Sequence, residues 1–437
     1  MVAQDDPAAT SIGAPARARI AAALAPVDAE LARRYPGDPG TRQPVHTVYV
    51  PADAFGARTV RDWGRRALDA LDAHAPDAGA FAAAVGLPDQ AAGEVYDRVR
   101  AKLAREPVED LRVDFEDGYG PRPDDEEDAA ALAAARVVAG TAAAGRGTPY
   151  AGIRAKCLEA AVRDRGIRTL DLFLTALLRA GGGTLPDGLV LTLPKVTYPE
   201  QVGAMAGLLG EFERVHGLPA GRLGFEIQIE TTQAVLGADG RATVARMIDA
   251  AGGRATGLHY GTFDYSAACG VSAAYQSMDH PVADHAKAVM QVAAAGTGVR
   301  LSDGSVNVLP TGDGARVRAA WRRHYGLVRR SLARAFYQGW DMHPGHLPTR
   351  YAAVFAFYRE GLDAACARLA AYADGGPGAA GAAVLDEPAT ARALAGHLLR
   401  GLDCGALDAA EVTGRTGLGR PELDALAGRR HRHPPGG

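Results

Sequence analysis

A carboxylate at the end of a strand-like segment is the first residue whose position in this sequence suggests chemistry. The segment Leu223–Glu230 alternates between apolar and polar residues: Phe225, Ile227 and Ile229 against Glu226, Gln228 and Glu230. Because strand side chains point alternately to opposite faces, the polar set should share one face, and the apolar set can pack on helices. A buried carboxylate is costly unless it is paired or binds a metal. Glu230 is therefore a candidate metal ligand, with an internal salt bridge as the structural alternative.

Three carboxylates crowd the end of an earlier segment of the same kind. Over Leu111–Phe115 the alternation places Asp114 and Glu116 on one face, and Asp117 starts the turn that leaves the strand. Like charges this close need cations, either a divalent metal or nearby arginine and lysine side chains. Glu116 and Asp117 are therefore candidates for proton transfer or for orienting water bound to a metal.

The next segment supplies basic groups. Arg154 and Lys156 should lie on a common face, opposite Ile153. The planar guanidinium of Arg154 is the better fork for a substrate carboxylate. A purely structural pair between an arginine and a carboxylate is the alternative.

A turn rich in small residues precedes another acid. In Gly257–Asp264 the pair Gly261 and Thr262 opens the turn, so that backbone amides can approach a ligand, and Asp264 follows at the strand end. Carboxylate oxygens suit magnesium, which keeps waters or substrate oxygens in its open positions. Glu230 and Asp264 on neighbouring strands would make such a site, and Mn²⁺ is the alternative ion.

These residues need a scaffold that brings strand ends together. Strand-like runs alternate with Ala-, Leu- and Arg-rich segments of helical period, which is typical of βα units around a parallel sheet. The expected strands are Val45–Val50, Leu111–Phe115, Gly152–Lys156, Leu189–Leu193, Leu223–Ile229 and Gly257–Tyr260, followed by a seventh within Ala293–Leu301 and an eighth at Tyr337–Met342. Eight strands with intervening helices predict a fold of the α/β class, a (β/α)8 TIM barrel, whose functional residues lie at the carboxyl ends of the strands.

The barrel is expected to have a segment on each side. Residues 1–40 read as a tail and one Ala-rich helix that ends near Tyr35–Gly37, residues 41–350 as the catalytic barrel, and residues 351–437 as a C-terminal helical extension. A Gly- and Pro-rich loop at 374–381 marks a linker within the extension.

The composition of the chain excludes several classes of binding partner. The 437-residue chain has a formal net charge of -3, which gives no electrostatic footprint for nucleic acid or an anionic membrane. No stretch approaches the roughly 18 continuous apolar residues of a membrane span. The four cysteines are far apart and lack CxxC spacing, which favours a reducing cytoplasm. Small molecules or other subunits are the expected partners.

Taken together, these segments resemble the citrate lyase β-subunit-like and HpcH/HpaI aldolase superfamily of phosphoenolpyruvate/pyruvate-type barrels, with an added likeness to malate synthases. The landmarks are a D-x-E-D strand at Val113–Asp117, a substrate arginine at Ile153–Arg154, a P-K strand at Leu193–Lys195, a metal-binding I-E-T at Ile229–Thr231, a G-x-x-D at Gly261–Asp264 and a segment ending in H-P at Gly339–Pro344. The match extends over about residues 45 to 350.

The resemblance implies a magnesium-dependent carbon–carbon lyase or aldolase that acts on a small 2-oxo or hydroxy acid through a metal-stabilised enolate. It places Glu230 and Asp264 on the metal and Arg154 on the substrate carboxylate, with Glu116 and Asp117 as the other catalytic candidates. Gly261, Thr262 and Lys195 would line the substrate site. Related barrels are often homo-oligomers, trimers or hexamers.

Three departures from the superfamily pattern bear on this interpretation. Pyruvate aldolases usually carry a histidine where this chain has Asp117, which favours the citrate-lyase-like branch. Members that cleave an acyl-CoA borrow an aspartate from a C-terminal segment or a neighbouring subunit; no counterpart maps here, although Asp386 and Asp403 are available. Lys195, beside Pro194, is interpreted as a charge partner of the carboxylates rather than as a Schiff-base lysine.

Several alternatives stay open at this point. A malate synthase-like or citrate-lyase-like enzyme would use a CoA thioester as a substrate. Phosphoryl chemistry at a phosphoenolpyruvate-type site is a further reading, but no phosphohistidine domain is visible. A barrel kept as a non-catalytic ligand-binding protein is the last. Among the histidines, His259 is expected to be a satisfied core residue, and His343 is expected to fix the loop after the eighth strand.

Overall fold

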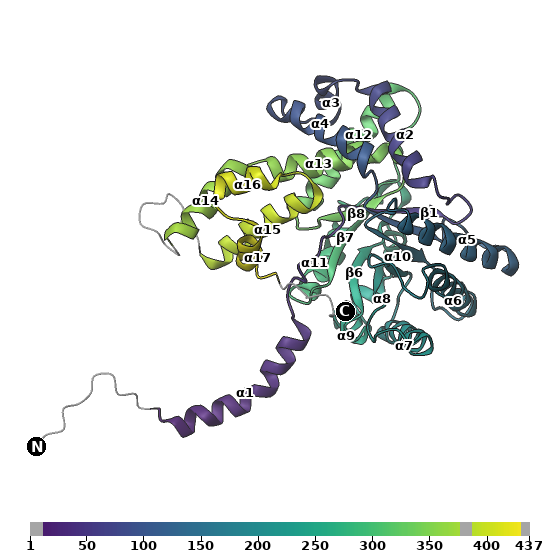
Figure 1. The fold of residues 1–437 in the computed structure, drawn as a ribbon. Coiled ribbons are helices and arrows are strands. Elements are labelled where there is room, and N and C mark those ends of the chain that lie inside the picture. The colour runs from purple at the N-terminus through teal and green to yellow at the C-terminus, as the bar shows by residue number, and fades with distance from the viewer. Residues whose placement is uncertain (1–11, 376–386, 430–437) are drawn as a thin grey trace, which may run out of the picture.

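The computed structural model describes residues 12–375 and 387–429, and within them eight parallel strands close into one barrel in chain order (Figure 1). The strands are β1 (Thr47–Pro51), β2 (Asp110–Asp114), β3 (Tyr150–Arg154), β4 (Leu191–Leu193), β5 (Phe225–Ile229), β6 (Ala255–Tyr260), β7 (Arg300–Ser305) and β8 (Gln338–Asp341). The barrel closes where β8 pairs with β1. The predicted TIM barrel is confirmed, and it brings the carboxyl ends of all the strands to one face.

Helices connect the strands and cover the outside of the barrel (Figure 1). Those up to the end of the barrel are α1 (Ala14–Arg34), α2 (Thr59–His74), α3 (Ala78–Val85), α4 (Asp89–Arg105), α5 (Asp124–Ala143), α6 (Arg163–Ala180), α7 (Pro199–His216), α8 (Thr232–Val235), α9 (Thr243–Ala250), α10 (Thr262–Ala268), the 3-10 turn η1 (Ala273–Tyr275), α11 (Pro281–Ala294) and α12 (Gly314–Ala333). Among the described residues, no helix is long and apolar enough to cross a membrane.

The barrel has an apolar outside and a charged inside, because successive strand residues face opposite ways. Outward residues such as Val48 and Val113 are fully buried against the helices. Inside, buried Arg112 donates to Asp110, to Thr192 Oγ1 and, over 2.8 Å, to Glu226. Buried charges are tolerated when each has partners of this kind, so the interior is held together by polar pairs.

The seventh strand lies later in the sequence than expected. The prediction placed it within Ala293–Leu301, but α11 continues to Ala294, and β7 occupies Arg300–Ser305. Between them, Gly296 and Gly298 adopt positive φ angles of 77° and 83°. Such angles suit glycine and end a helix, so these residues form the connection rather than the strand.

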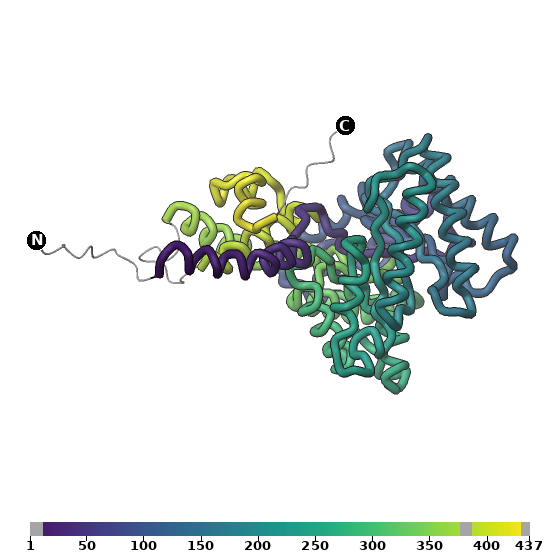
Figure 2. The backbone as a smooth tube through the Cα atoms, turned by 90° about the horizontal axis from the view of Figure 1, so that it is seen from below, coloured from purple at the N-terminus to yellow at the C-terminus, as the bar shows by residue number. Residues whose placement is uncertain are grey.

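The expected N-terminal helix is present as α1, and it projects from the body of the molecule in Figure 1, whereas in Figure 2 it is drawn across the C-terminal helices. None of its residues is buried. Its apolar stripe is Ile20, Leu24, Val27 and Leu31, each between 50% and 57% exposed. The helix ends at Arg34, next to the segment Tyr35–Gly37 where the sequence predicts its end.

A group of helices follows the barrel, and its later members lie to the left of the strands in Figure 1. It comprises η2 (Pro344–His346), α13 (Leu347–Arg359), α14 (Leu362–Gly375), α15 (Pro388–Cys404), α16 (Ala409–Thr416) and α17 (Arg420–Ala427). The helix α13 is almost entirely buried and packs on α12 and α4. The expected boundary at residue 350 lies inside this helix, and most of the loop expected at 374–381 lies outside the described residues.

Candidate active site

The candidate residues gather at the carboxyl ends of five successive strands, β2 to β6. Arg154 is the last residue of β3, and Glu230 directly follows β5. Glu116 and Lys195 each lie two residues beyond the end of their strand, β2 and β4, and Asp264 lies in the first turn of α10 after β6. Because β2 to β6 are neighbours in the closed barrel, the fold places these side chains along one side of its mouth.

Lys195 contacts both the second-strand and the fifth-strand carboxylates. Its Nζ lies 2.7 Å from Glu116 Oε1 and 2.6 Å from Asp117 Oδ2, and its backbone N–H donates to Glu230 Oε1 over 2.7 Å. Asp264 Oδ2 lies 3.8 Å from the same ammonium. One residue therefore connects all four carboxylates of the site.

Glu230 is 4% exposed, and it is held close to the backbone of the neighbouring turn. Burial raises the pKa of Glu230 to about 7, and the nearby Asp264 adds to the rise, against the opposing effects of Arg154 and Lys195. A Cβ added at Gly261 would lie 2.4 Å from Glu230 Cβ and 2.5 Å from Oε2. Gly261 therefore leaves the space that the Glu230 side chain occupies.

Replacing Gly261 by alanine should displace Glu230, because contacts that short force the carboxylate to move. If Glu230 binds the metal, the magnesium affinity of Gly261→Ala should fall by at least about tenfold, as measured by isothermal titration calorimetry. Gly326→Ala is the matched control, since a Cβ there meets nothing within 4 Å. Unchanged magnesium binding in a folded Gly261→Ala variant would contradict the role given to Glu230.

Glu116 and Asp117 lie side by side, but their pKa values are shifted in opposite directions. Burial raises the pKa of Glu116, despite the lowering effects of Arg154 and Lys195. Burial alone would also raise the pKa of Asp117, but the hydrogen bond and the charge of Lys195, together with smaller effects of Glu116 and Arg154, outweigh burial, and the pKa of Asp117 is lowered. Neighbouring groups whose pKa values are pushed apart suit different roles, one carrying a proton and the other staying charged.

Arg154 is buried and surrounded by partners. Its Nε and Nη2 each donate to Asp114 over 2.7 Å, and its Nη1 donates to Gln228 over 3.2 Å and lies 3.5 Å from Glu116. The guanidinium also lies over the rings of Tyr49 and Trp340, at 4.7 and 5.4 Å from their centroids. Five side chains thus fix the orientation of this arginine.

Sequence reasoning missed two of these supports. Tyr49 lies between two valines of β1, and Trp340 follows Gly339 in β8; both project into the barrel, where their rings are 4.4 Å apart. The alternation that assigned Glu230 to the interior applies equally to these strands. Their inward position could therefore have been predicted, although not their contact with Arg154.

The side chains of Lys156 and Thr262 make their polar contacts outside the carboxylate cluster. Lys156 does not join Arg154 at the carboxylates, because β3 ends at Arg154 and the Lys156 ammonium contacts Glu127 on α5 and the Phe115 carbonyl. Thr262 is buried and its hydroxyl donates to the Ser305 carbonyl of β7 over 3.4 Å. The threonine side chain thus lies toward β7, while its neighbour Gly261 lies against Glu230.

The residues present fit a divalent cation of the magnesium type. Glu230 and Asp264 offer hard carboxylate oxygens from adjacent strand ends, which is the donor set that magnesium prefers. The Lys195 ammonium shows that a positive charge is stabilised among these acids. No histidine is needed for such a site.

A second group of ligand-type side chains is a weaker metal candidate. His324, Asp341 and His346 are buried, and their ligand atoms lie within 4.8 Å of one another. Arg350 already donates to both oxygens of Asp341. The two imidazole rings are stacked with an interplanar angle of 13°, so their in-plane lone pairs do not converge on one point. We interpret the group as a hydrogen-bonded network that anchors β8.

His343 has the structural role expected for it, and His259 is buried in the core as expected. His343 Nδ1 accepts from the Gly345 N–H and so fixes the turn after β8, and His259 is buried, with its Nε2 3.0 Å from Glu226. Asp403, one of the two aspartates considered for acyl-CoA chemistry, is paired with Arg420 and Arg429 in the C-terminal group. Asp386 lies outside the described residues.

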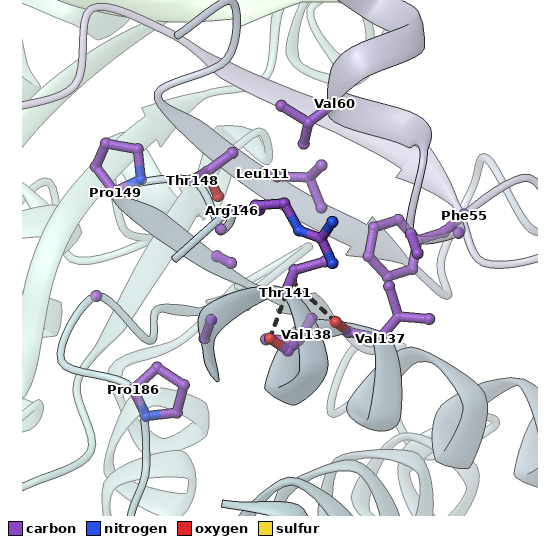
Figure 3. A pocket seen from close by; sticks show the side chains of 16 residues that line it. Phe55, Val60, Leu111, Val137, Val138, Thr141, Arg146, Thr148, Pro149 and Pro186 are labelled. Atoms are coloured by element: carbon purple, nitrogen blue, oxygen red, sulfur yellow. Dashed lines mark hydrogen bonds between the residues drawn. The ribbon is translucent and has the colours of Figure 1, made fainter. Parts of the chain in front are cut away.

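Two cavities lie away from the site. One of about 1140 Å³ opens at the amino ends of the strands, bounded by α1, Tyr150, Gly224 and Arg300. The other, of about 60 Å³, lies between α5 and residues 55–60 and is lined mainly by apolar groups, with Arg146 reaching across it (Figure 3). Active sites of TIM barrels lie at the carboxyl ends of the strands, so neither cavity is the candidate site.

Several solved structures are similar to this chain. A citrate lyase from Burkholderia xenovorans LB400 is 19% identical, with a TM-score of 0.53, covering 73% of this chain and 91% of that one. A Haloferax volcanii malate synthase is 14% identical (TM-score 0.46; 71% and 72% covered). The Mycobacterium tuberculosis protein CitE is 18% identical (TM-score 0.46; 84% and 99% covered).

These neighbours come from the groups that the motifs resemble, citrate lyases and malate synthases, and an HpcH/HpaI aldolase family protein also matches. At 19% identity and a TM-score of 0.53, the likeness to the citrate lyase shows the fold alone. No curated protein matches the chain. A family profile described as a domain of unknown function, DUF6986, matches residues 24–431, and the chain therefore belongs to this family.

Proposed function

We propose that this protein is a magnesium-dependent carbon–carbon lyase or aldolase that acts on a small 2-oxo or hydroxy acid. The observation that carries the proposal is the buried Glu230, set between Asp264 and the backbone of Lys195 at the carboxyl ends of adjacent strands. A buried carboxylate with a pKa of about 7 lowers the stability of the folded protein unless a cation binds it. Mn²⁺ is the alternative ion.

The chain's own residues would bind the substrate and handle its proton. When bound, magnesium would polarise the carbonyl and carboxylate oxygens of the substrate and stabilise the negative charge that develops as the bond breaks. Arg154 would hold the substrate carboxylate through Nη1. This nitrogen makes the longest of the polar contacts of Arg154, at 3.5 Å from Glu116. Backbone groups at Gly261 and the Lys195 ammonium would line the same opening.

Glu116 is the better candidate for carrying the proton. Its pKa is raised by burial, so its carboxyl group can be protonated at a higher pH than Asp117. Asp117 would stay ionised and hold the Lys195 ammonium. General acid–base catalysis works best when the pKa of the group is near the working pH.

Use of a CoA thioester is the second candidate. The aspartate at position 117, where pyruvate aldolases have histidine, favours it. Asp403 is a poor candidate for the catalytic aspartate of such an enzyme within the same chain. Its carboxylate is only 6% exposed and is paired with two arginines. A non-catalytic ligand-binding barrel is the third reading.

The test is formation of pyruvate, oxaloacetate or glyoxylate from a panel of 2- and 3-hydroxy acids and their CoA thioesters, with and without magnesium. Turnover of a free acid that is lost in Asp264→Asn would support the aldolase. Turnover of thioesters alone would support the second candidate. Magnesium binding without turnover across the panel would favour the non-catalytic reading.

We also propose that the chain forms a homo-oligomer, a trimer or hexamer, in the cytoplasm. All four cysteines are free, which suits a reducing compartment. Light scattering on the full chain would measure the mass of the assembly. A single species at 45.3 kDa would contradict oligomer formation.

A further inference from the structure

Lys195 has an unusual backbone. Its φ angle is 50°, in the left-handed region that residues other than glycine, asparagine and aspartate rarely adopt. This conformation directs its N–H to Glu230 Oε1 at 2.7 Å, while its side chain reaches Glu116 and Asp117. Strained backbone of this kind persists where the surrounding contacts require it, and it is concentrated at functional sites.

The ammonium of Lys195 lies among three carboxylates. Glu116 and Asp117 are within 2.7 Å of Nζ, and Asp264 is 3.8 Å away. Asp264 is also a proposed metal ligand. The lysine therefore offers the acids the positive charge that a divalent ion would otherwise supply.

We propose that Lys195 is a built-in counter-ion, with which a divalent ion must compete for this cluster of carboxylates. The inference rests on the proposed function, since it concerns the same metal site. When the ion binds at Glu230 and Asp264, repulsion between the two positive charges moves the Lys195 ammonium away from Asp264 and loosens its hold on Glu116 and Asp117. Lys195 would thus set how tightly the site binds the metal and release Glu116 only when the metal is present.

Magnesium affinity measured by isothermal titration calorimetry tests the competition. Lys195→Met keeps the length of the side chain and removes the charge, so it should bind magnesium at least about tenfold more tightly than the wild type. Lys195→Arg keeps the charge and the same backbone conformation, and it should bind like the wild type. Circular dichroism would check that each variant is folded.

The outcomes separate this inference from the proposed function. If the wild type binds magnesium and Lys195→Met binds it equally or more weakly, the counter-ion role is wrong and the metal site stands. If neither protein binds magnesium or manganese, both proposals fail. Binding by Lys195→Met alone would support the competition in its strongest form.

A second measurement uses the wild-type protein. The chain has four lysines, and the side chains of Lys102, Lys156 and Lys287 are 3%, 13% and 5% exposed, against 25% for Lys195. Acetylation by a succinimidyl ester, followed by mass spectrometry, therefore reports mainly on Lys195. Magnesium chloride should accelerate labelling of Lys195 at least about twofold relative to sodium chloride of equal ionic strength. An unchanged or slower rate in a protein that binds magnesium would overturn the displacement.

Discussion

Glu230→Gln is expected to abolish magnesium binding and turnover, yet to raise the stability of the metal-free protein at pH 8. Burial raises the pKa of Glu230 from 4.5 to about 7 in the folded protein. An acid with a raised pKa in the folded state favours folding in its protonated form, so stability is lost as the pH rises from about 4.5 to about 7. The neutral amide of glutamine should recover about 3 kcal/mol of that loss at pH 8.

Chemical denaturation in EDTA at pH 4.5 and at pH 8 would measure the effect. The stabilisation should appear at pH 8 and nearly vanish at pH 4.5, where the carboxyl group is protonated in the folded wild-type protein. Glu226→Gln is the matched control, because Glu226 lies on the same strand and the same face. Although burial opposes it, His259 and Arg112 lower the pKa of Glu226 to about 2, so neutralising it should destabilise the protein at pH 8. A fall in stability for Glu230→Gln at pH 8 would contradict the cost assigned to this carboxylate.

The interior of β5 could be predicted from sequence because strand geometry determines it. Once Leu223–Glu230 is interpreted as a strand, alternation places Glu226, Gln228 and Glu230 on one face. The structure places Glu226 against Arg112 and Gln228 against Arg154, both inside the barrel. The same rule, applied to several strands in order, predicts a barrel with its acids at one end.

Residues just beyond strand ends were harder to predict, because alternation stops where the strand stops. Lys156 was expected to share a face with Arg154, but β3 ends between them and Lys156 contacts α5. The seventh strand was misplaced for a related reason. Small apolar residues fit a helix as well as a strand, and Ala293 and Ala294 belong to α11.

The conformation of Lys195 has no signal in the sequence. A lysine after Leu193-Pro194 gives no indication that it would adopt a φ angle of 50° or that its N–H would donate to Glu230, which is 35 residues away in the sequence. The rings around Arg154 are a similar case. Tyr49 and Trp340 come from strands that are distant in sequence and meet only because β8 closes the barrel against β1.

Arg154→Lys is the second substitution with a large expected effect. Asp114 receives two parallel hydrogen bonds from Arg154, and a lysine cannot supply both. Asp114 also accepts from the Glu116 and Gly118 backbone N–H groups, so it connects Arg154 to the loop that carries Glu116. Disrupting this buried pair should cost about 3 kcal/mol of unfolding free energy. If Arg154 also holds the substrate carboxylate, kcat/KM should fall by on the order of a hundredfold or more.

Arg112→Lys separates the structural part of that effect from the functional part. Arg112 is also buried, but it lies two residues before the carboxyl end of β2. There it contacts Asp110, Glu226 and Thr192 inside the barrel. The Arg112→Lys variant should lose a comparable amount of unfolding free energy, while its KM stays within about threefold of the wild-type value. Arg154→Lys should raise KM far more if Arg154 Nη1 holds the substrate carboxylate, because lysine lacks that group. Equal KM changes in the two variants, measured with the same substrate well below their unfolding temperatures, would show that Arg154 only holds the barrel together.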